Sequence, residues 1–286
     1  MVETAPPIDV LLREMTPDDL VAAHGLSREV SWPHRLEDWQ FVHRLGHGMV
    51  AEIGGTVAGT AMWWPFGERA ATLGMVVVAA ERQGLGIGRK LMEAVLGATG
   101  DRAVTLNATE AGRPLYERLG FREIGTVRQH QGTAFSVPLA PLESGERIRP
   151  IGRADETALA ALDLEATGRP RTALLSALLG VADGIALDRN GETVGFALFR
   201  RFGRGYVIGP VVAENAEGAK ALISHWVGAH AGMFLRIDVP GDSGLSGWLN
   251  DLGLTGVDPV ATMARGTPPL RGTTVGTFAA VNQALG

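Results

Sequence analysis

The chain carries one local pattern twice. Residues 48–59 (GMVAEIGGTVAG) and 184–195 (GIALDRNGETVG) align without a gap, and each has a short apolar run, a turn pair and a second apolar run. The turn pairs, Gly-Gly and Asn-Gly, tolerate positive φ, so both segments predict β-hairpins. An ordered repeat constrains the fold more than any single element, because it predicts two units of one type in series.

Later segments continue both series in the same order. Apolar stretches at 73–78 and 208–213 predict buried strands, and a helix pattern follows each of them. A Leu-Gly pair at 119–120 and another at 252–253 predict helix ends. Because strands and helices alternate, the sequence predicts an α/β (α+β) fold class with two tandem domains around mixed sheets.

The repeat breaks at 139–146, where Pro and Gly interrupt the pattern. We therefore expect a first domain over 1–140 and a second over 147–286, and two domains of this size suit a chain of 286 residues. Short apolar matches also arise between unrelated α/β domains. The gapless hairpin and the ordered later matches favour a duplication.

The composition excludes several classes of protein. Apolar residues make up 45% and charged residues 20%, which argues against disorder. The net charge of −5 and the lack of a basic run argue against nucleic acid as a partner. Without cysteine, the chain has no disulfide, thiolate metal site or cysteine nucleophile. The first residues, MVETAPP, lack the regions of a signal peptide, and no apolar run reaches the roughly 18 residues of a membrane span, so we expect a cytoplasmic protein with no membrane partner.

The most specific local feature is the segment 76–92 (VVVAAERQGLGIGRKLM), in which a buried strand runs into a glycine-rich turn that opens an amphipathic helix. Glycine lets the backbone approach a ligand closely. Unpaired N–H groups at a helix start, together with the helix dipole, attract phosphate oxygens. The segment therefore predicts a diphosphate cradle, and the alternative is a tight strand-to-helix turn with no ligand.

Two common diphosphate motifs do not fit this segment. A P-loop requires Lys directly after its last glycine, but Arg89 follows Gly88. The dinucleotide fingerprint requires a third glycine where Arg89 stands. The remaining pattern, Gln83-x-x-Gly86-x-Gly88, resembles the pyrophosphate loop of the GCN5-related N-acetyltransferases (the GNAT family), which binds coenzyme A.

A second segment, 104–121 (VTLNATEAGRPLYERLGF), adds to the resemblance. It is similar to the family's second cofactor-contacting segment, where a Tyr faces the coenzyme sulfur as general acid and a polar residue at a strand end contacts pantetheine. Tyr116 and Asn107 stand at those two positions. A departing thiolate needs such an acid. The alternative for Tyr116 is a core aromatic on a helix face.

The resemblance implies acetyl-CoA as co-substrate, no metal, and in each half a mixed, mostly antiparallel sheet flanked by helices. It also implies a splayed strand whose backbone pairs with pantetheine and polarises the thioester. The family's proline after this strand is Ala80 here, a small departure because the glycines carry the phosphate geometry. The cofactor-binding residues that it implies are Val76, Val77, Val78, Gln83, Gly84, Leu85, Gly86, Ile87, Gly88, Arg89 and Asn107.

The second copy lacks both cofactor features. Its loop at 214–218 (ENAEG) is shorter and holds one glycine and two acids, which would repel a pyrophosphate. Leu249 stands where the first copy has Tyr116, so no hydroxyl is present. We therefore predict a degenerate GNAT-like domain that does not bind coenzyme A productively and that completes the substrate cleft or supports the fold.

An aromatic segment lies where the family places its acceptor-shaping loop. Trp32 and His34 are the candidate substrate contacts, and Trp39, Trp63 and Trp64 extend them into an aromatic wall that suits apolar or cationic acceptors. The alternative is that these Trp side chains fill the core. No second ligand follows His34 at helix spacing, which argues against a metal site.

Together these features predict an acyl-CoA-dependent N-acyltransferase that passes acetyl directly, in a ternary complex, to the primary amine of a small molecule. The alternative is a non-catalytic acyl-CoA sensor or binding module, and the presence of Tyr116 favours catalysis. The sequence also allows an acyl donor longer than acetyl, because the predicted cradle contacts only the coenzyme part of the donor.

Glu52 and Glu81 are candidate bases, and for each the alternative is a solvated surface acid. The duplication replaces the contacts of single-domain relatives, so we expect a monomer.

Overall fold

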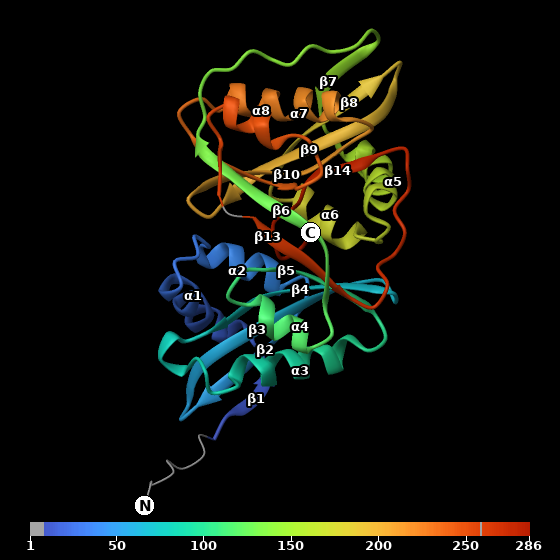
Figure 1. The fold of residues 1–286 in the computed structure, drawn as a ribbon. Coiled ribbons are helices and arrows are strands. Elements are labelled where there is room, and N and C mark those ends of the chain that lie inside the picture. Colours follow the sequence, from blue (N-terminus) through green and yellow to red (C-terminus); the bar gives the residue numbers. More distant parts are fainter. Residues whose placement is uncertain (1–8, 258) are drawn as a thin grey trace, which may run out of the picture. The chain divides into compact units, whose positions relative to one another are not determined.

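The computed structural model describes residues 9–257 and 259–286 (Figure 1). The segment in which we expect no signal peptide, residues 1–7, lies outside these ranges. Contacts divide the chain into two compact units. Unit 1 holds the residues up to Trp64 and Leu73–Gly100, and unit 2 holds Pro65–Thr72 and Asp101–Gly286. No helix in the described ranges has both the length and the apolar character needed to cross a membrane.

Unit 1 is built on four neighbouring strands with helices packed on them. In spatial order the strands are β1 (Leu11–Glu14), β2 (His47–Ile53), β3 (Thr56–Phe66) and β4 (Ala70–Val78). The helices are α1 (Leu20–Glu29), α2 (Leu36–His43) and α3 (Ile87–Thr99), with single turns at Pro17–Asp19 and Ala80–Arg82. Helix α3 packs on β2 through one apolar face that contains Leu91 and Val95, a spacing of one helical turn.

Unit 2 is a larger, mostly antiparallel sheet flanked by helices (Figure 1). In spatial order its main strands are β5 (Ala103–Ala108), β13 (Val260–Arg265), β6 (Arg122–Thr133), β11 (Phe234–Pro240), β10 (Gly205–Ala213), β9 (Glu192–Phe202), β8 (Asp183–Arg189) and β7 (Glu146–Pro150). Two short strands lie beside them, β12 (Thr255–Gly256) on β6 and β14 (Gly276–Ala279) on β10. The helices are α4 (Arg113–Arg118), α5 (Glu156–Thr167), α6 (Thr172–Leu179), α7 (Ala216–Ala229) and α8 (Ser246–Asp251), with a single turn at Arg153–Asp155. The predicted fold class is confirmed.

One strand of the second half lies inside the sheet of the first half. Strand β13 pairs with β5, where Met263 faces Leu106, and on its other side with β6. Strand β6 in turn pairs with β11, where Phe234 faces Thr133. The compact units therefore do not coincide with the consecutive domains expected over 1–140 and 147–286. Those ranges describe the proposed duplication and stay a prediction.

Both predicted hairpins are present, and they share an irregularity. The register of β2 against β3 shifts between Ala51 and Glu52. The register of β8 against β9 shifts between Leu187 and Asp188, the equivalent residues of the gapless alignment. A bulge re-aims side chains and adds twist, and bulges persist in related folds. The shared bulge therefore supports a common origin for the two copies.

An ion-pair network ties the bulge of unit 1 to the start of its first helix. Arg13 on β1 donates from Nη2 to Asp19 Oδ1 at 2.7 Å and from Nε to Glu52 Oε2 at 2.9 Å. Asp19 also accepts from the Thr16 backbone N–H at 2.8 Å. The hydrogen bond from Arg13 lowers the pKa of Asp19 to about 2. Glu52 is thus held in a structural ion pair, which argues against its candidacy as the base.

Unit 2 has the same network at the equivalent positions. Arg149 on β7 contacts Asp155 Oδ1 at 2.7 Å through Nη2 and Asp188 Oδ2 at 2.7 Å through Nε. The Gly152 backbone N–H donates to Asp155 Oδ2 at 2.7 Å. The hydrogen bond from Arg149 lowers the pKa of Asp155. Local patterns did not predict these pairs, because the partners lie on three separate elements.

Candidate functional site

The glycine-rich loop of unit 1 presents unpaired backbone donors. Gly84 and Gly86 have φ values of 78° and 77°, a region that glycine enters at no steric cost. The first helical hydrogen bond of α3 runs from the Lys90 N–H to Gly86 O at 3.1 Å. The N–H groups of Ile87 and Gly88 precede it and have no acceptor within the helix. No side chain of the described residues caps this helix, so its start presents backbone donors with the helix dipole behind them.

Side chains around the loop support its shape. Gln83 donates from Nε2 to Val78 O at 3.2 Å and so braces the loop against the end of β4. Ile87 is buried at 1% exposure, while Leu85 is exposed. Arg89 pairs with Glu93 at 2.7 Å on the exposed face of α3. Of the predicted cofactor contacts, Ile87 therefore offers its backbone N–H and not its side chain.

Strand β4 is distorted just before the predicted pantetheine residues. Met75 has a φ of 53°, which is uncommon for a residue other than glycine. Its carbonyl accepts from Thr60 Oγ1 at 2.8 Å. The parallel pairing of β4 with β5 covers Ala70 to Thr72, and Val76–Val78 lie beyond those residues in the strand. This arrangement is consistent with the predicted splayed strand, whose contact with pantetheine stays a prediction.

Tyr116 lies in unit 2, on the short helix α4. Its side chain is 8% exposed and meets Phe121 edge to face, with ring centroids 6.1 Å apart. Among the described residues the structure shows no hydrogen-bond partner for its hydroxyl. Burial raises the pKa of Tyr116 to about 12, so the phenol keeps its proton at neutral pH. The phenol therefore has a proton to give, and in the described part of the chain its hydroxyl is not committed to another group.

Asn107 makes contacts that the sequence did not predict. Its Nδ2 donates to Gln283 O at 2.8 Å, and its Oδ1 accepts from Thr262 Oγ1 at 2.8 Å. Both partners come from the C-terminal part of the chain, so this amide ties that part to the end of β5. A second N–H of the amide is left for a ligand, and the predicted pantetheine contact stays a prediction.

In the equivalent loop of the second copy, a side chain of the loop itself already engages one backbone donor. Asn215 caps α7, and its Oδ1 accepts from the Gly218 N–H at 2.8 Å. Glu214 pairs with Arg189. Leu249, at the position equivalent to Tyr116, is fully buried. These contacts are consistent with the prediction that this copy does not bind coenzyme A productively.

The two candidate acceptor residues lie together in unit 1. Trp32 and His34 have ring centroids 5.6 Å apart and line a shallow, open depression with His24 and Arg28. A ring nitrogen of His24 lies 3.1 Å from His34 O and fixes this turn. No group of three or more His, Asp or Glu side chains in the described ranges is placed to hold a metal ion.

The three other Trp side chains of the predicted wall belong to the core of unit 1 and form no open wall. Trp39, Trp63 and Trp64 are each at most 7% exposed. The indole of Trp39 donates to Ser27 Oγ at 3.2 Å, and that of Trp64 donates to Val42 O at 2.8 Å. Buried indoles need such partners. The core alternative therefore holds for these three residues.

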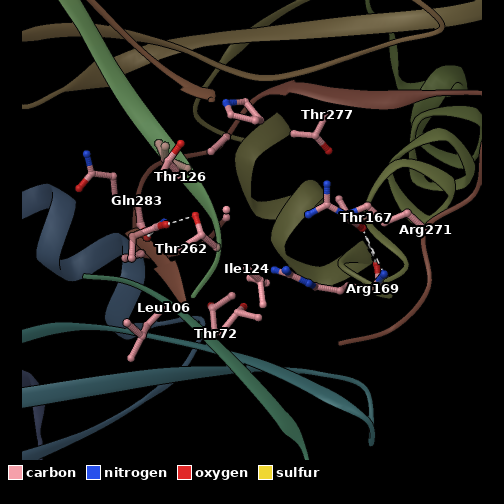
Figure 2. Close-up of a pocket in the computed structure, with 18 of the residues that line it drawn as sticks. Thr72, Leu106, Ile124, Thr126, Thr167, Arg169, Thr262, Arg271, Thr277 and Gln283 are labelled. Atoms are coloured by element: carbon pink, nitrogen blue, oxygen red, sulfur yellow. Dashed lines mark hydrogen bonds between the residues drawn. The ribbon is translucent and has the colours of Figure 1, made fainter. Parts of the chain in front are cut away.

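A cavity of about 360 Å³ in unit 2 was not predicted (Figure 2). Arg169, Arg171 and Arg271 contribute to its wall. The sequence offers one local signal, the Arg-Pro-Arg run at 169–171 directly after α5. Arg271 comes from a distant segment, so only the folded chain brings the three cations to one cavity.

Two family models match the chain, and both describe an acetyltransferase (GNAT) domain. One matches residues 44–123, and the other matches residues 159–279. Each copy of the repeat therefore has a match of its own, and the two matches together span more than half of the chain.

Two curated proteins are similar in sequence. An uncharacterised N-acetyltransferase of Bacillus subtilis (strain 168) is 30% identical over 177 residues, which are 61% of this chain and 62% of that protein. The 5-NmdU N-acetyltransferase of Pseudomonas phage PaMx11 is 42% identical over 60 residues, which are 20% of this chain and 43% of the phage protein. The chain thus covers less than two thirds of either relative.

Solved structures share the fold. A Pyrococcus horikoshii protein assigned as an acetyltransferase matches with a TM-score of 0.78 at 18% identity, over 100% of both chains. A tandem GNAT protein from the clavulanic acid biosynthesis pathway matches with a TM-score of 0.67 at 15% identity, over 90% of this chain and 98% of that one. At such identities the likeness shows the fold alone. Two matched domains in one chain, carried on this fold, place the protein in the GCN5-related N-acetyltransferase family as a tandem member.

Proposed function

We propose that the protein transfers an acyl group, acetyl in the first instance, from acyl-CoA to the primary amine of a small molecule. The observation that carries this proposal is the uncapped start of α3, where the N–H groups of Ile87 and Gly88 have no acceptor within the helix and follow a loop with the family's glycine pattern. The phage relative is named for N-acetyl transfer to 5-NmdU, which supports an amine as the acceptor.

The reaction proceeds by direct attack within a ternary complex. The neutral amine nitrogen attacks the thioester carbonyl, the C–N bond forms, and the C–S bond breaks as the coenzyme thiolate leaves. The nitrogen loses one proton to solvent as the amide forms, and the Tyr116 phenol gives its proton to the thiolate and recovers one from solvent. Backbone N–H groups from Ile87 to Arg89 hold the pyrophosphate, and Val76–Val78 pair with pantetheine.

The first test measures stoichiometry and turnover together. Titration calorimetry of the full-length protein with acetyl-CoA is expected to give one equivalent bound, because the second loop has two acids and a single glycine, whose N–H is taken by Asn215. An amine screen, read by release of free thiol from acetyl-CoA, is expected to find a substrate. Two equivalents of similar affinity would contradict a single cofactor site. Binding without thiol release for any amine would favour a non-catalytic acyl-CoA module.

A second test isolates the electrostatics of the loop. Gly84 has open space where a Cβ would lie and a φ of 78°, which Asn and Asp tolerate better than other side chains. Gly84→Asn adds a neutral side chain, and Gly84→Asp adds a side chain of nearly the same shape that carries a negative charge. We expect the Asp variant to bind acetyl-CoA about tenfold or more weakly than the Asn variant, as one charge-assisted contact is worth about 1.5–3 kcal/mol.

The same two substitutions, Asp and Asn, are also made near the C-terminal end of α3 as a control. Gly97 is exposed, lies on the same helix and has open space around it. Gly97→Asp and Gly97→Asn are expected to bind acetyl-CoA equally well. If Gly84→Asp and Gly84→Asn also bind equally, the loop does not hold the pyrophosphate.

A further inference from the structure

The cavity of unit 2 is lined by polar side chains from several elements. Figure 2 shows Thr126, Thr262 and Gln283 on one side, with Thr167, Arg169 and Arg271 on the other. Six threonines line the cavity: Thr72, Thr105, Thr126, Thr167, Thr262 and Thr277. A volume of about 360 Å³ falls in the range of small-molecule sites. We call this cavity the Thr–Arg pocket.

The three arginines of the Thr–Arg pocket differ in how they are paired. Arg171 is fully engaged, because its Nη2 lies 2.6 Å from Asp163 Oδ1 and its Nη1 donates to Gly286 O. Within the described ranges, the structure shows no acceptor for the guanidinium of Arg169 or of Arg271. Asp242 is the one side-chain acid among the described lining residues, and it is exposed, while the Gly286 oxygen that Arg171 binds also lines the pocket. The charges of Arg169 and Arg271 are therefore not paired with an acid side chain in the described ranges.

The segment that bears Arg271 is fixed against α5. The Gly272 N–H donates to Glu165 O at 2.8 Å, and Thr274 Oγ1 donates to Glu165 Oε1 at 2.8 Å. The backbone packs so closely that a Cβ on Gly168 would lie 2.3 Å from Leu270 O. The backbone at Arg271 is thus held beside the end of α5, two residues before Arg169. The backbone of this segment is therefore fixed, while the Arg271 side chain itself is exposed.

The electrostatics favour an anion in this place. Burial, followed by the charges of Arg171 and Arg271, lowers the pKa of Arg169 to about 10, while Asp163 acts in the opposite direction. The guanidinium still carries its charge at neutral pH. A carboxylate or phosphate beside it would relieve the repulsion and accept paired N–H donors, the geometry that a guanidinium prefers.

We propose that the Thr–Arg pocket binds a small organic anion, with a carboxylate or phosphate group on Arg169 and Arg271 and with polar groups against the threonines. The binding proposal stands on the pocket alone. Whether the anion is part of the acceptor amine or a separate ligand that alters the rate rests on the proposed acyl transfer.

The direct test is binding to the full-length protein. Inorganic phosphate, succinate and O-phosphoethanolamine are titrated by calorimetry and by thermal shift. At least one is expected to bind saturably and to raise the Tm, while succinamide, the neutral counterpart of succinate, has no effect. A double variant, Arg169→Met with Arg271→Met, is expected to bind about tenfold or more weakly. Arg204→Met, which removes an exposed arginine outside the pocket, is the matched control and keeps full binding.

Two results would overturn the proposal. One is the absence of saturable binding by all three probe anions, and the other is equal binding by the wild type and the double variant. The Tm without added anion is a further check. Because the double variant removes two mutually repelling charges, its Tm is expected to equal or exceed that of the wild type. A clear fall would show that the arginines are already compensated within the chain, contrary to the proposal.

Turnover then separates the two sources of the anion. Amines are compared in pairs that differ by one anionic group, lysine with cadaverine and O-phosphoethanolamine with ethanolamine. If the anionic member has the lower KM and the double variant loses that preference, the anion belongs to the acceptor. If succinate instead changes the rate with cadaverine, the anion is a separate effector. If no amine releases thiol, the proposed function fails, while the binding test still decides this proposal.

Discussion

Replacing Tyr116 by Phe is expected to lower kcat about a hundredfold or more, with the affinity for acetyl-CoA nearly unchanged. General acid catalysis contributes about 10²–10⁴-fold, and Phe keeps the packing of the ring against Phe121. Burial raises the pKa of Tyr116 to about 12, so the wild-type hydroxyl is protonated throughout the usual assay range. Single-turnover thiol release and calorimetry measure the two quantities separately.

The chain supplies a matched control for this variant. It contains two tyrosines, and the other, Tyr206, stacks on Phe199 at 4.9 Å between ring centroids. Tyr206→Phe is expected to leave kcat unchanged. An unchanged kcat in Tyr116→Phe would remove this residue from the mechanism. A parallel loss of kcat and of acetyl-CoA binding would show that Tyr116 supports the structure and is not the acid.

Replacing Asp163 by Asn is expected to lower the free energy of unfolding by about 3–5 kcal/mol, the cost of leaving one partner of a buried ion pair alone. Arg171 and Asp163 have side chains that are 2% and 3% exposed, and they form two contacts of 2.6 and 3.0 Å. Asn keeps the volume of Asp but loses its charge, so the Arg171 guanidinium stays buried without a counter-ion. Urea unfolding, followed by circular dichroism, measures the loss.

An exposed ion pair in the same unit serves as the reference. Glu217 and Lys220 lie one helical turn apart on α7, and the side chain of Glu217 is 63% exposed. Glu217→Gln is expected to cost less than about 1 kcal/mol, because solvent screens such a pair. A similarly small effect of Asp163→Asn would mean that Arg171 finds another partner and that the buried pair contributes little.

The features that the sequence predicted are those that depend only on residues close together along the chain. Turn pairs at 54–55 and 190–191 specify hairpins because only certain residues accept positive φ. Apolar spacing specifies the buried face of α3. The glycines before α3 specify an open helix start, since no side chain there is able to cap it. For the same reason the loop was the best-defined part of the candidate site.

The features that the sequence did not predict depend on partners far along the chain. The pairing of β13 with β5 joins residues more than 150 positions apart, and the sequence of neither strand indicates which strand it pairs with. Arg271 meets Arg169 only because its segment is bonded to Glu165. Trp39 and Trp64 fit a binding wall and a core equally well by residue type, and their hydrogen bonds to Ser27 and Val42 decide for the core.

The position of β13 bears on how this chain has been able to evolve. With β13 seated between β5 and β6, the second half supplies backbone hydrogen bonds to two strands of the first half. Deleting everything after residue 140 would remove the β13 neighbour of β5 and both neighbours of β6, and unpaired strand edges favour aggregation. Selection for a stable first half therefore retains the second half as well. On the predicted duplication, the second copy, whose loop lacks the glycines of the first, is retained because β11 and β13 pair with strands of the first half.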